Sequence, residues 1–171
     1  NDAPTGSVTI TGTAAEGETL TADVSGVTDE DGDTLTYSYQ WSTSTDGSAW
    51  TDINGATSKT YGIAADGTEN GNKFKVTVVA DDGQTQANST TTLTSAETAA
   101  VVNVNDAPTI TVFANDFTED AATLSTSTVA GTYTTSDEDS GDTLTVTFNT
   151  PSAHYTLDPT TEKVLLAQAG I

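Results

Sequence analysis

The sequence has no cysteine, no methionine and no arginine, and its 171 residues include only four lysines. Without cysteine it can form no disulfide framework, no thiolate metal site and no cysteine nucleophile. Its 25 acidic residues leave a formal charge of −21, and because phosphate binding depends on Lys and Arg, we expect no nucleic-acid partner. No apolar run approaches the ~20 residues that a membrane-spanning helix needs, and no basic, apolar leader opens the sequence. We therefore expect no membrane insertion, and we expect any export signal to lie elsewhere.

Threonine is the commonest residue, with 38 positions, and the pattern of the chain is that of an all-β protein. β-Branched threonine favours extended backbone on half-exposed surfaces. Residue types alternate with the period of two expected for strands in Ser7–Thr11, Thr34–Trp41, Lys73–Val79 and Thr143–Phe148. Asp-Gly and Asn-Gly dipeptides, which favour tight turns, separate such segments. Regularly spaced short strands predict a sandwich or a barrel.

An internal repeat divides the chain in two. Asn1–Thr5 (NDAPT) returns as Asn105–Thr109, and Thr28–Thr36 returns as Ser136–Thr145 with one serine inserted. The first unit, residues 1–104, has the length of one β-sandwich domain. The second, residues 105–171, is expected to be the N-terminal part of another sandwich without its last pair of strands. We interpret the chain as a fragment of a longer array, cut inside its second repeat.

In the first unit, the spacing predicts strands at about 7–13, 18–25, 34–43, 48–53, 57–63, 72–80 and 89–104. If the alternation holds, the side chains that face inward are those of Leu20, Trp41, Tyr61, Ile63 and Val76. Trp50 follows an Asp-Gly turn, and we expect its ring to cap the end of the sandwich rather than to stack against a sugar.

The first unit and the linker after it contain the motifs Gly17–Ala22 (GETLTA), Tyr39–Trp41 (YQW), Trp50–Thr57 (WTDINGAT) and Val102–Pro108 (VNVNDAP). Together they resemble the tandem immunoglobulin-like repeats of giant bacterial surface adhesins, the repeats-in-toxin (RTX) adhesins exported by type I secretion. The second unit contains Thr118–Asp120, Asp137–Leu144 and Tyr155–Asp158, and it resembles the cadherin-like repeats of the same proteins. The resemblance implies tandem β-sandwiches at the bacterial cell surface. The glycine-rich calcium nonapeptides of the toxins are absent.

This topology is expected to bring the acidic loops to the two ends of the first unit. The N-terminal pole would collect Asp2, Asp29, Asp31, Asp33, Asp81 and Asp82. The other pole would collect Glu16, Asp66, Glu69, Asn103, Asn105 and Asp106, where they would meet Asp137, Asp139 and Asp142 of the second unit. Converging carboxylates repel one another unless they are neutralised, and oxygen-only ligation suits Ca²⁺. The alternative is that these acids are solvated loop residues that keep a secreted protein soluble.

The cadherin resemblance implies a calcium site at the junction. Cadherin linkers bind calcium with the pattern Asp-x-Asn-Asp-Asn-x-Pro, helped by a Glu of the first loop and a later Asp-x-Asp. Here Glu16 and Asp137-x-Asp139 fit that pattern, but Asn103 replaces the first Asp and Ala107 replaces the last Asn. With one charged ligand fewer, we expect one or two ions there.

Two chemical alternatives find little support in the sequence. The loop from Asp29 opens like an EF-hand, but Thr34 stands where that loop needs Gly and Gln40 where it needs a bidentate Glu. The single histidine, His154, follows Pro151 on an expected loop with no Ser or Asp constellation nearby. The carboxylate pairs lie within local loops rather than across the cleft that a glycosidase needs. We therefore expect that the protein is not an enzyme.

Two classes of function remain. In the first, the chain is a calcium-rigidified spacer of a large bacterial surface adhesin, acting in cell adhesion and biofilm by projecting a distal ligand-binding domain. Its partners would be the neighbouring repeats of the same chain, joined through calcium-bridged linkers, and the protein would be a monomer. In the second, the sandwich itself binds a glycan or a host protein, for which Trp50 is the one free aromatic candidate.

Overall fold

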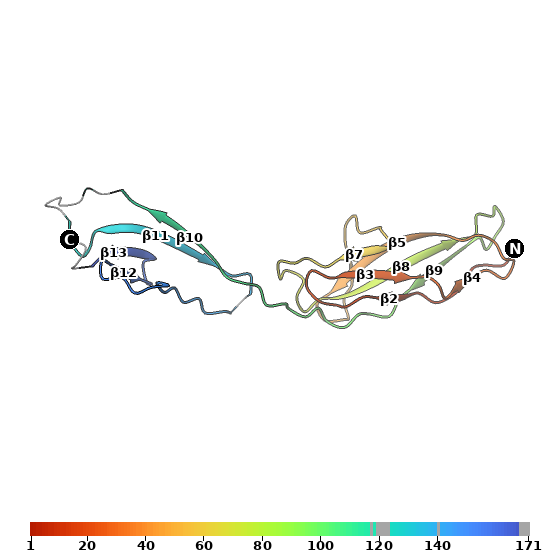
Figure 1. The fold of residues 1–171 in the computed structure, drawn as a ribbon. Helices are drawn as coiled ribbons and strands as arrows, with labels where there is room; N and C mark the ends of the chain where they lie inside the picture. Colours follow the sequence, from red (N-terminus) through yellow and green to blue (C-terminus); the bar gives the residue numbers. More distant parts are fainter. Residues whose placement is uncertain (117, 119–123, 140, 168–171) are drawn as a thin grey trace. The chain divides into compact units, whose positions relative to one another are not determined.

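The computed structural model describes residues 1–116, 118, 124–139 and 141–167, and the chain divides into two compact units (Figure 1). Unit 1 is Asn1–Val104 and unit 2 is Asn105–Ile171, so the division falls where the NDAPT repeat begins. Every regular element among the described residues is a β-strand, which confirms the all-β prediction. Those residues hold no helix with the length and apolar character to cross a membrane.

Unit 1 is a sandwich of two antiparallel sheets with a short ribbon beside them (Figure 1). Its strands are β1 (Thr5–Gly6), β2 (Thr9–Thr11), β3 (Thr19–Asp23), β4 (Val27–Thr28), β5 (Thr36–Ser44), β6 (Thr51–Asp52), β7 (Thr60–Gly62), β8 (Lys73–Asp81) and β9 (Thr90–Thr94). One sheet has the order β2-β3-β7, the other has the order β6-β5-β8-β9, and β1 pairs with β4. An unbroken ladder of nine residue pairs joins β5 to β8.

The core of unit 1 lies between the two sheets and is built by alternation along β8. Every second residue from Phe74 to Ala80 is fully buried, while the residues between them are half-buried. Trp41 of β5 lies opposite Val76 and is also fully buried. Its indole N–H donates to the carbonyl oxygen of Ser58 at 2.9 Å, so the buried ring leaves no unpaired donor.

The predicted inward-facing residues occupy this core. Leu20, Trp41, Ile63 and Val76 are buried, as predicted. Tyr61 is half-buried, and its ring packs between those of Trp41 and Phe74, with centroid distances of 5.7 and 5.0 Å. Trp50 is half-buried: Lys75 Nζ lies 4.2 Å from its ring centroid, and its indole N–H donates to Gly47 O at 3.3 Å.

The last strand of unit 1 is shorter than its predicted range of 89–104, because β9 ends at Thr94. Beyond it, Val101 still donates to the carbonyl of Asn72 at 2.8 Å. The next residue, Val102, pairs in parallel with Ala15, which lies between β2 and β3. The chain therefore leaves the β8 ladder in order to reach the other sheet.

Unit 2 has a single antiparallel sheet among its described residues, with the order β10-β11-β13-β12. The strands are β10 (Thr109–Ala114), β11 (Val129–Ser136), β12 (Tyr155–Asp158) and β13 (Lys163–Leu166). Tyr133 and Leu166 are buried, but Ile110 and Val112 of β10 are 52 % and 62 % exposed. Of the motif Thr118–Asp120, residues 119 and 120 lie outside the described residues.

The predicted strand Thr143–Phe148 is wrong, because this segment forms no strand. Its alternation persists: Leu144, Val146 and Phe148 are half-buried and the threonines between them are exposed. In unit 1 the matching strand is β5, which is hydrogen-bonded to β8. No described strand of unit 2 occupies the place of β8. An alternating sequence favours extended backbone, but a strand also needs a partner for its N–H and C=O groups.

Candidate metal centres

The first acidic loop, residues 29–33, lies between β4 and β5 and is folded by its own first residue. Asp29 Oδ1 accepts the backbone N–H of Asp31 at 2.9 Å and that of Asp33 at 3.5 Å. Gly32 has a φ of 78°, which glycine adopts without steric cost. This curl brings carboxylate oxygens of Asp29, Asp31 and Asp33 within 4.8 Å of one another.

The second acidic loop, Asp137–Asp139 with Gly141 and Asp142, begins with the same type of hydrogen bond in unit 2. Asp137 Oδ1 accepts the backbone N–H of Asp139 at 2.9 Å, and Gly141 has a φ of 103°. Carboxylate oxygens of Asp137, Asp139 and Asp142 lie within 4.8 Å of one another. Within the described part of the chain, these two loops are the only groups of three His, Cys, Asp or Glu side chains this close together. The sequence repeat is thus also a repeat of side-chain geometry.

Each acidic loop also holds the segment through which the chain enters its unit. Asp31 Oδ2 accepts the backbone N–H of Asp2 at 2.7 Å, and Asp139 Oδ2 accepts the backbone N–H of Asp106 at 2.7 Å. The side chains of Asp2 and Asp106 do not join the groups of three. These two predicted residues therefore contact the acidic loops through their backbone.

The carboxylates of the first acidic loop have little neutralising charge around them. The described residues form one salt bridge, between Lys73 and Glu97 at 2.7 Å, and it lies outside both loops. Among the described residues, Asp33 Oδ2 accepts the neutral side-chain amide of Gln84, at 3.1 Å. Asp29 Oδ2 is enclosed by protein and has no hydrogen-bond partner. An enclosed carboxylate oxygen is unfavourable unless a cation or a donor reaches it.

A third group of oxygen ligands, the exit cluster of Glu16, Asn70 and Asn103, lies where the chain leaves unit 1. Glu16 is only 7 % exposed. Its Oε2 accepts the backbone N–H of Val104 at 3.2 Å and the amide of Asn70 at 3.4 Å, whereas its Oε1 is enclosed and has no partner. Asn70 also donates to Asn103 Oδ1, and its own Oδ1 is enclosed without a partner. The exit cluster therefore contains two enclosed oxygen atoms, Glu16 Oε1 and Asn70 Oδ1, that accept no hydrogen bond from the described residues.

Sequence reasoning places Glu16 and Asn103 at this pole but misses Asn70. The sequence predicts a turn at the dipeptide Asn70-Gly71, and the positive φ of Gly71, 81°, agrees with that turn. The turn does not use the Asn70 side chain, which instead bonds to residues far away in the sequence. The feature of the sequence that could have identified Asn70 as a ligand is its position in the same loop as Asp66 and Glu69.

Two predicted ligands of this pole are engaged elsewhere. The Glu69 carboxylate accepts the Tyr61 hydroxyl and, at 2.7 Å, the backbone N–H of Ala64. Burial, and then the hydrogen bond to Glu69, raises the pKa of Tyr61. Asp66 accepts the hydroxyl and the N–H of Thr68 at 2.6 and 3.1 Å, and these bonds lower the pKa of its carboxyl. Both acids therefore stabilise the loop between β7 and β8.

The remaining predicted residues make contacts outside the groups of three. Asp81 Oδ1 accepts the N–H of Gly83 at 2.7 Å, which shapes the turn after β8. The Asn105 amide donates to the carbonyl of Asp106 at 3.0 Å. Asp82, only 5 % exposed, accepts the side-chain amide of Asn1 at 3.0 Å. Asp82 thereby fixes the first residue of unit 1 beside the loop that follows β8.

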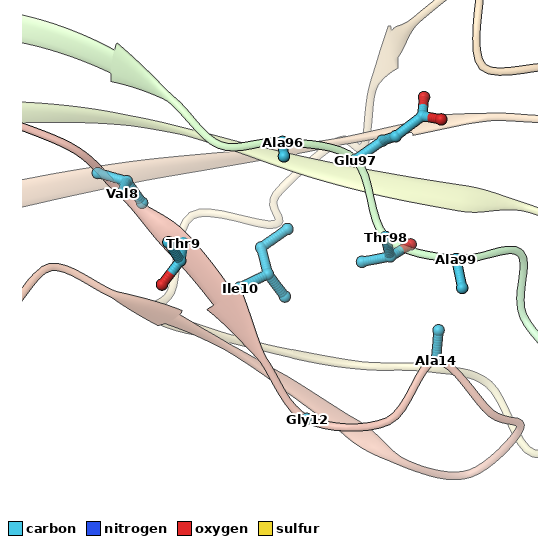
Figure 2. A pocket seen from close by; sticks show the side chains of 9 residues that line it. All are labelled: Val8, Thr9, Ile10, Gly12, Ala14, Ala96, Glu97, Thr98 and Ala99. Carbon is cyan, nitrogen blue, oxygen red and sulfur yellow. The ribbon is translucent and has the colours of Figure 1, made fainter.

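Unit 1 also has an open cavity of about 320 Å³ between β2 and the segment after β9. It is lined by Val8, Thr9, Ile10, Gly12, Ala14 and residues 96–99 (Figure 2). The only charged lining residue is Glu97, whose carboxylate points away from Ile10 and Ala14 in Figure 2 and bonds to Lys73. The cavity thus lacks the convergent polar groups that would orient a ligand.

A comparison of the sequence with protein-family models and with curated protein sequences finds no match.

Proposed function

We propose that the chain is a calcium-binding spacer of a bacterial surface adhesin. The observation that carries this proposal is the recurrence of one three-acid loop, with the same hydrogen bond to the entering chain, at the start of both units. Acids that served only solubility would need neither shared geometry nor a shared contact. The adhesin context, and with it the cell-surface location, rests on the resemblance of the repeat motifs to RTX adhesins.

The chemistry of the ligands favours Ca²⁺ over other ions. Both groups of three offer carboxylate oxygens only, with no histidine or cysteine among them, and softer metals prefer nitrogen or sulfur. Ca²⁺ accepts about six to eight oxygens in flexible geometry, whereas Mg²⁺ requires a near-ideal octahedron. Backbone carbonyls and water would complete the coordination.

The spacer role is supported by Asp31 and Asp139, because each of these side chains makes two kinds of contact. Each belongs to a group of three carboxylates, and each also accepts the N–H of the entering segment. A bound cation would remove the repulsion among the three acids, so the loop would keep its curl and hold that segment in one direction. Without calcium, repulsion would loosen both contacts. The chain would then be pliable in a low-calcium cell interior and stiffer outside.

Thermal unfolding in calcium and in chelator tests the binding. We expect calcium to stabilise the protein by about 2.7 kcal/mol per site once free calcium reaches about 100 times the Kd. Asp31→Asn and Asp139→Asn should each remove most of one site's gain. The matched controls Glu30→Gln and Glu138→Gln remove the same charge from the same loops but not from the groups of three, and they should keep the gain. Identical melts in calcium and in chelator would contradict calcium binding.

Small-angle scattering tests the spacer role separately. We expect calcium to narrow the distribution of distances within the chain, because fewer directions of entry remain available to each unit. An unchanged, broad distribution at saturating calcium would leave binding intact and exclude the spacer role.

A further inference from the structure

Two Asn-Gly dipeptides occupy equivalent positions in two turns of unit 1. The first, Asn54-Gly55, lies in a turn closed by the N–H of Ala56, which donates to Ile53 O at 3.1 Å. The second, Asn70-Gly71, lies in a turn closed in the same way across residues 69–72, at 3.0 Å. The two glycines have φ values of 77° and 81°, and neither asparagine has a positive φ. Both turns therefore match type II, in which glycine stands third.

An asparagine followed by glycine can lose its side-chain amide without an enzyme. The glycine nitrogen loses its proton and attacks the asparagine Cγ, so that a new C–N bond forms, ammonia leaves and a five-membered succinimide ring results. Water then opens the ring on either side of this nitrogen, which gives aspartate or isoaspartate. Glycine favours the attack because it has no Cβ to hinder its nitrogen. Water is the only other reactant, and nothing is oxidised or reduced.

The contacts of the second dipeptide oppose this reaction. The N–H of Gly71 donates to Val101 O at 2.9 Å. The amide of Asn70 donates to Glu16 Oε2 at 3.4 Å and to Asn103 Oδ1, and its side chain is half-buried. The nitrogen that attacks and the side chain that is attacked are thus both held by other groups. The reaction there requires the loop to open first, and local opening costs free energy.

The first dipeptide has open surroundings. Asn54 and Gly55 are both exposed. Apart from the chain neighbours of Gly55, no described atom lies within 4 Å of the point where a side chain on this residue would begin. We propose that Asn54 is a site of spontaneous deamidation through a succinimide, whereas the contacts of Asn70 keep its side chain an amide. This inference does not depend on calcium.

The isoaspartate product would alter a turn that is bonded to the core strand β5. Ile53 N–H donates to Trp41 O at 2.9 Å, and Trp41 N–H donates to Ala56 O at 3.0 Å. The side-chain amide of Gln40 also donates to Ile53 O at 2.9 Å. Isoaspartate at position 54 adds one carbon to the main chain between these contacts, so the turn can no longer satisfy all of them in its present shape. Aspartate adds a negative charge but leaves the main chain unchanged.

Ageing of the intact chain at neutral pH, folded and in urea, tests the proposal. Cleavage after lysine separates the two dipeptides into residues 1–59 and 60–73, and mass spectrometry with fragmentation measures each conversion. In the folded chain we expect Asn54 to react about tenfold faster than Asn70 or more, because only Asn70 needs local opening. In urea the two rates should converge. Equal rates in the folded chain would overturn the proposal, as would a folded chain in which Asn54 stays intact while it reacts in urea.

Two variants separate the chemistry from its consequence. Asn54→Gln should stop the mass gain in residues 1–59 and leave the rate at Asn70 unchanged, since glutamine would have to form a larger, less favourable ring. A gain that persisted in this variant would assign the reaction to another residue. Asn54→Asp carries the product with the normal main chain and should melt like the fresh native protein, whereas the aged protein should melt at a lower temperature. An aged protein that melted like Asn54→Asp would contradict the altered turn.

Discussion

Glu16 is a nearly buried carboxylate whose surroundings would stabilise it better with a bound cation than without one. It is nearly buried, one of its oxygens has no donor, and its neighbours are the neutral side chain of Asn70 and a backbone N–H. A buried charge without a compensating partner opposes folding. With a bound cation, the charge of Glu16 would instead stabilise the folded state.

We therefore expect Glu16→Gln to have opposite effects in the two conditions. In chelator the variant should be more stable than the native protein by about 1–3 kcal/mol, since it removes an unpaired buried charge. In millimolar calcium it should be less stable, because a charged ligand is lost. Urea unfolding in both conditions measures this, with the exposed Glu18→Gln as control. A loss of the same size with and without calcium would show that Glu16 acts through its protein contacts alone.

Tyr61 gives unit 1 a dependence on alkaline pH. Its pKa is raised in the folded protein by burial and by Glu69, so folding favours the protonated phenol. That stabilisation is fully present below the ordinary tyrosine pKa of about 10 and is lost as the pH rises above it. Tyr61→Phe should cost about 1–2 kcal/mol at pH 7 through the lost hydrogen bond. It should also flatten the decline of stability above pH 10.

Urea unfolding from pH 7 to pH 11 checks this expectation. Tyr155→Phe, at an exposed position of unit 2, should leave the transition of unit 1 unchanged. If native and Tyr61→Phe proteins declined in parallel above pH 10, another group would be responsible.

Among the elements, β8 and the segment Thr143–Phe148 show what the sequence can and cannot predict. Both alternate with a period of two, and this alternation predicts a strand in each. β8 pairs on two sides, with β5 and β9, whereas Thr143–Phe148 has no described partner. Alternation reports which side chains face a core, but pairing depends on residues distant in the sequence. The same reason explains why the predicted strand 89–104 does not run to its end: β9 ends at Thr94, and Val102 pairs with Ala15 instead.

The acidic loops were predictable because their ligands are local. Three acids within five or six residues, beside a glycine with positive φ, can meet without help from the rest of the fold. The exit cluster depends instead on tertiary competition. Glu69 was also a candidate ligand of this pole in the sequence, but its carboxylate accepts the hydroxyl of Tyr61. Asn70 takes the place beside Glu16.

At the scale of the whole molecule, the contact between Val102 and Ala15 determines how unit 1 would resist force. The chain enters this unit at one end and leaves it at the other (Figure 1). Val102 N–H donates to Ala14 O at 3.0 Å, Glu16 N–H donates to Val102 O at 3.1 Å, and the two segments run parallel. Tension on both ends would therefore slide these neighbours past each other and load their hydrogen bonds together, in shear, instead of opening them one at a time.

Single-molecule pulling measures this consequence. Val102→Pro removes the N–H that bonds to Ala14, so unit 1 should unfold at a lower force, whereas Val102→Ala keeps the N–H and should unfold near the native force. Equal forces for both variants would place the mechanical resistance in another pair of strands. Under the proposed spacer role unit 1 is pulled along its length, and this is the direction in which the segments at Ala15 and Val102 are hydrogen-bonded to each other.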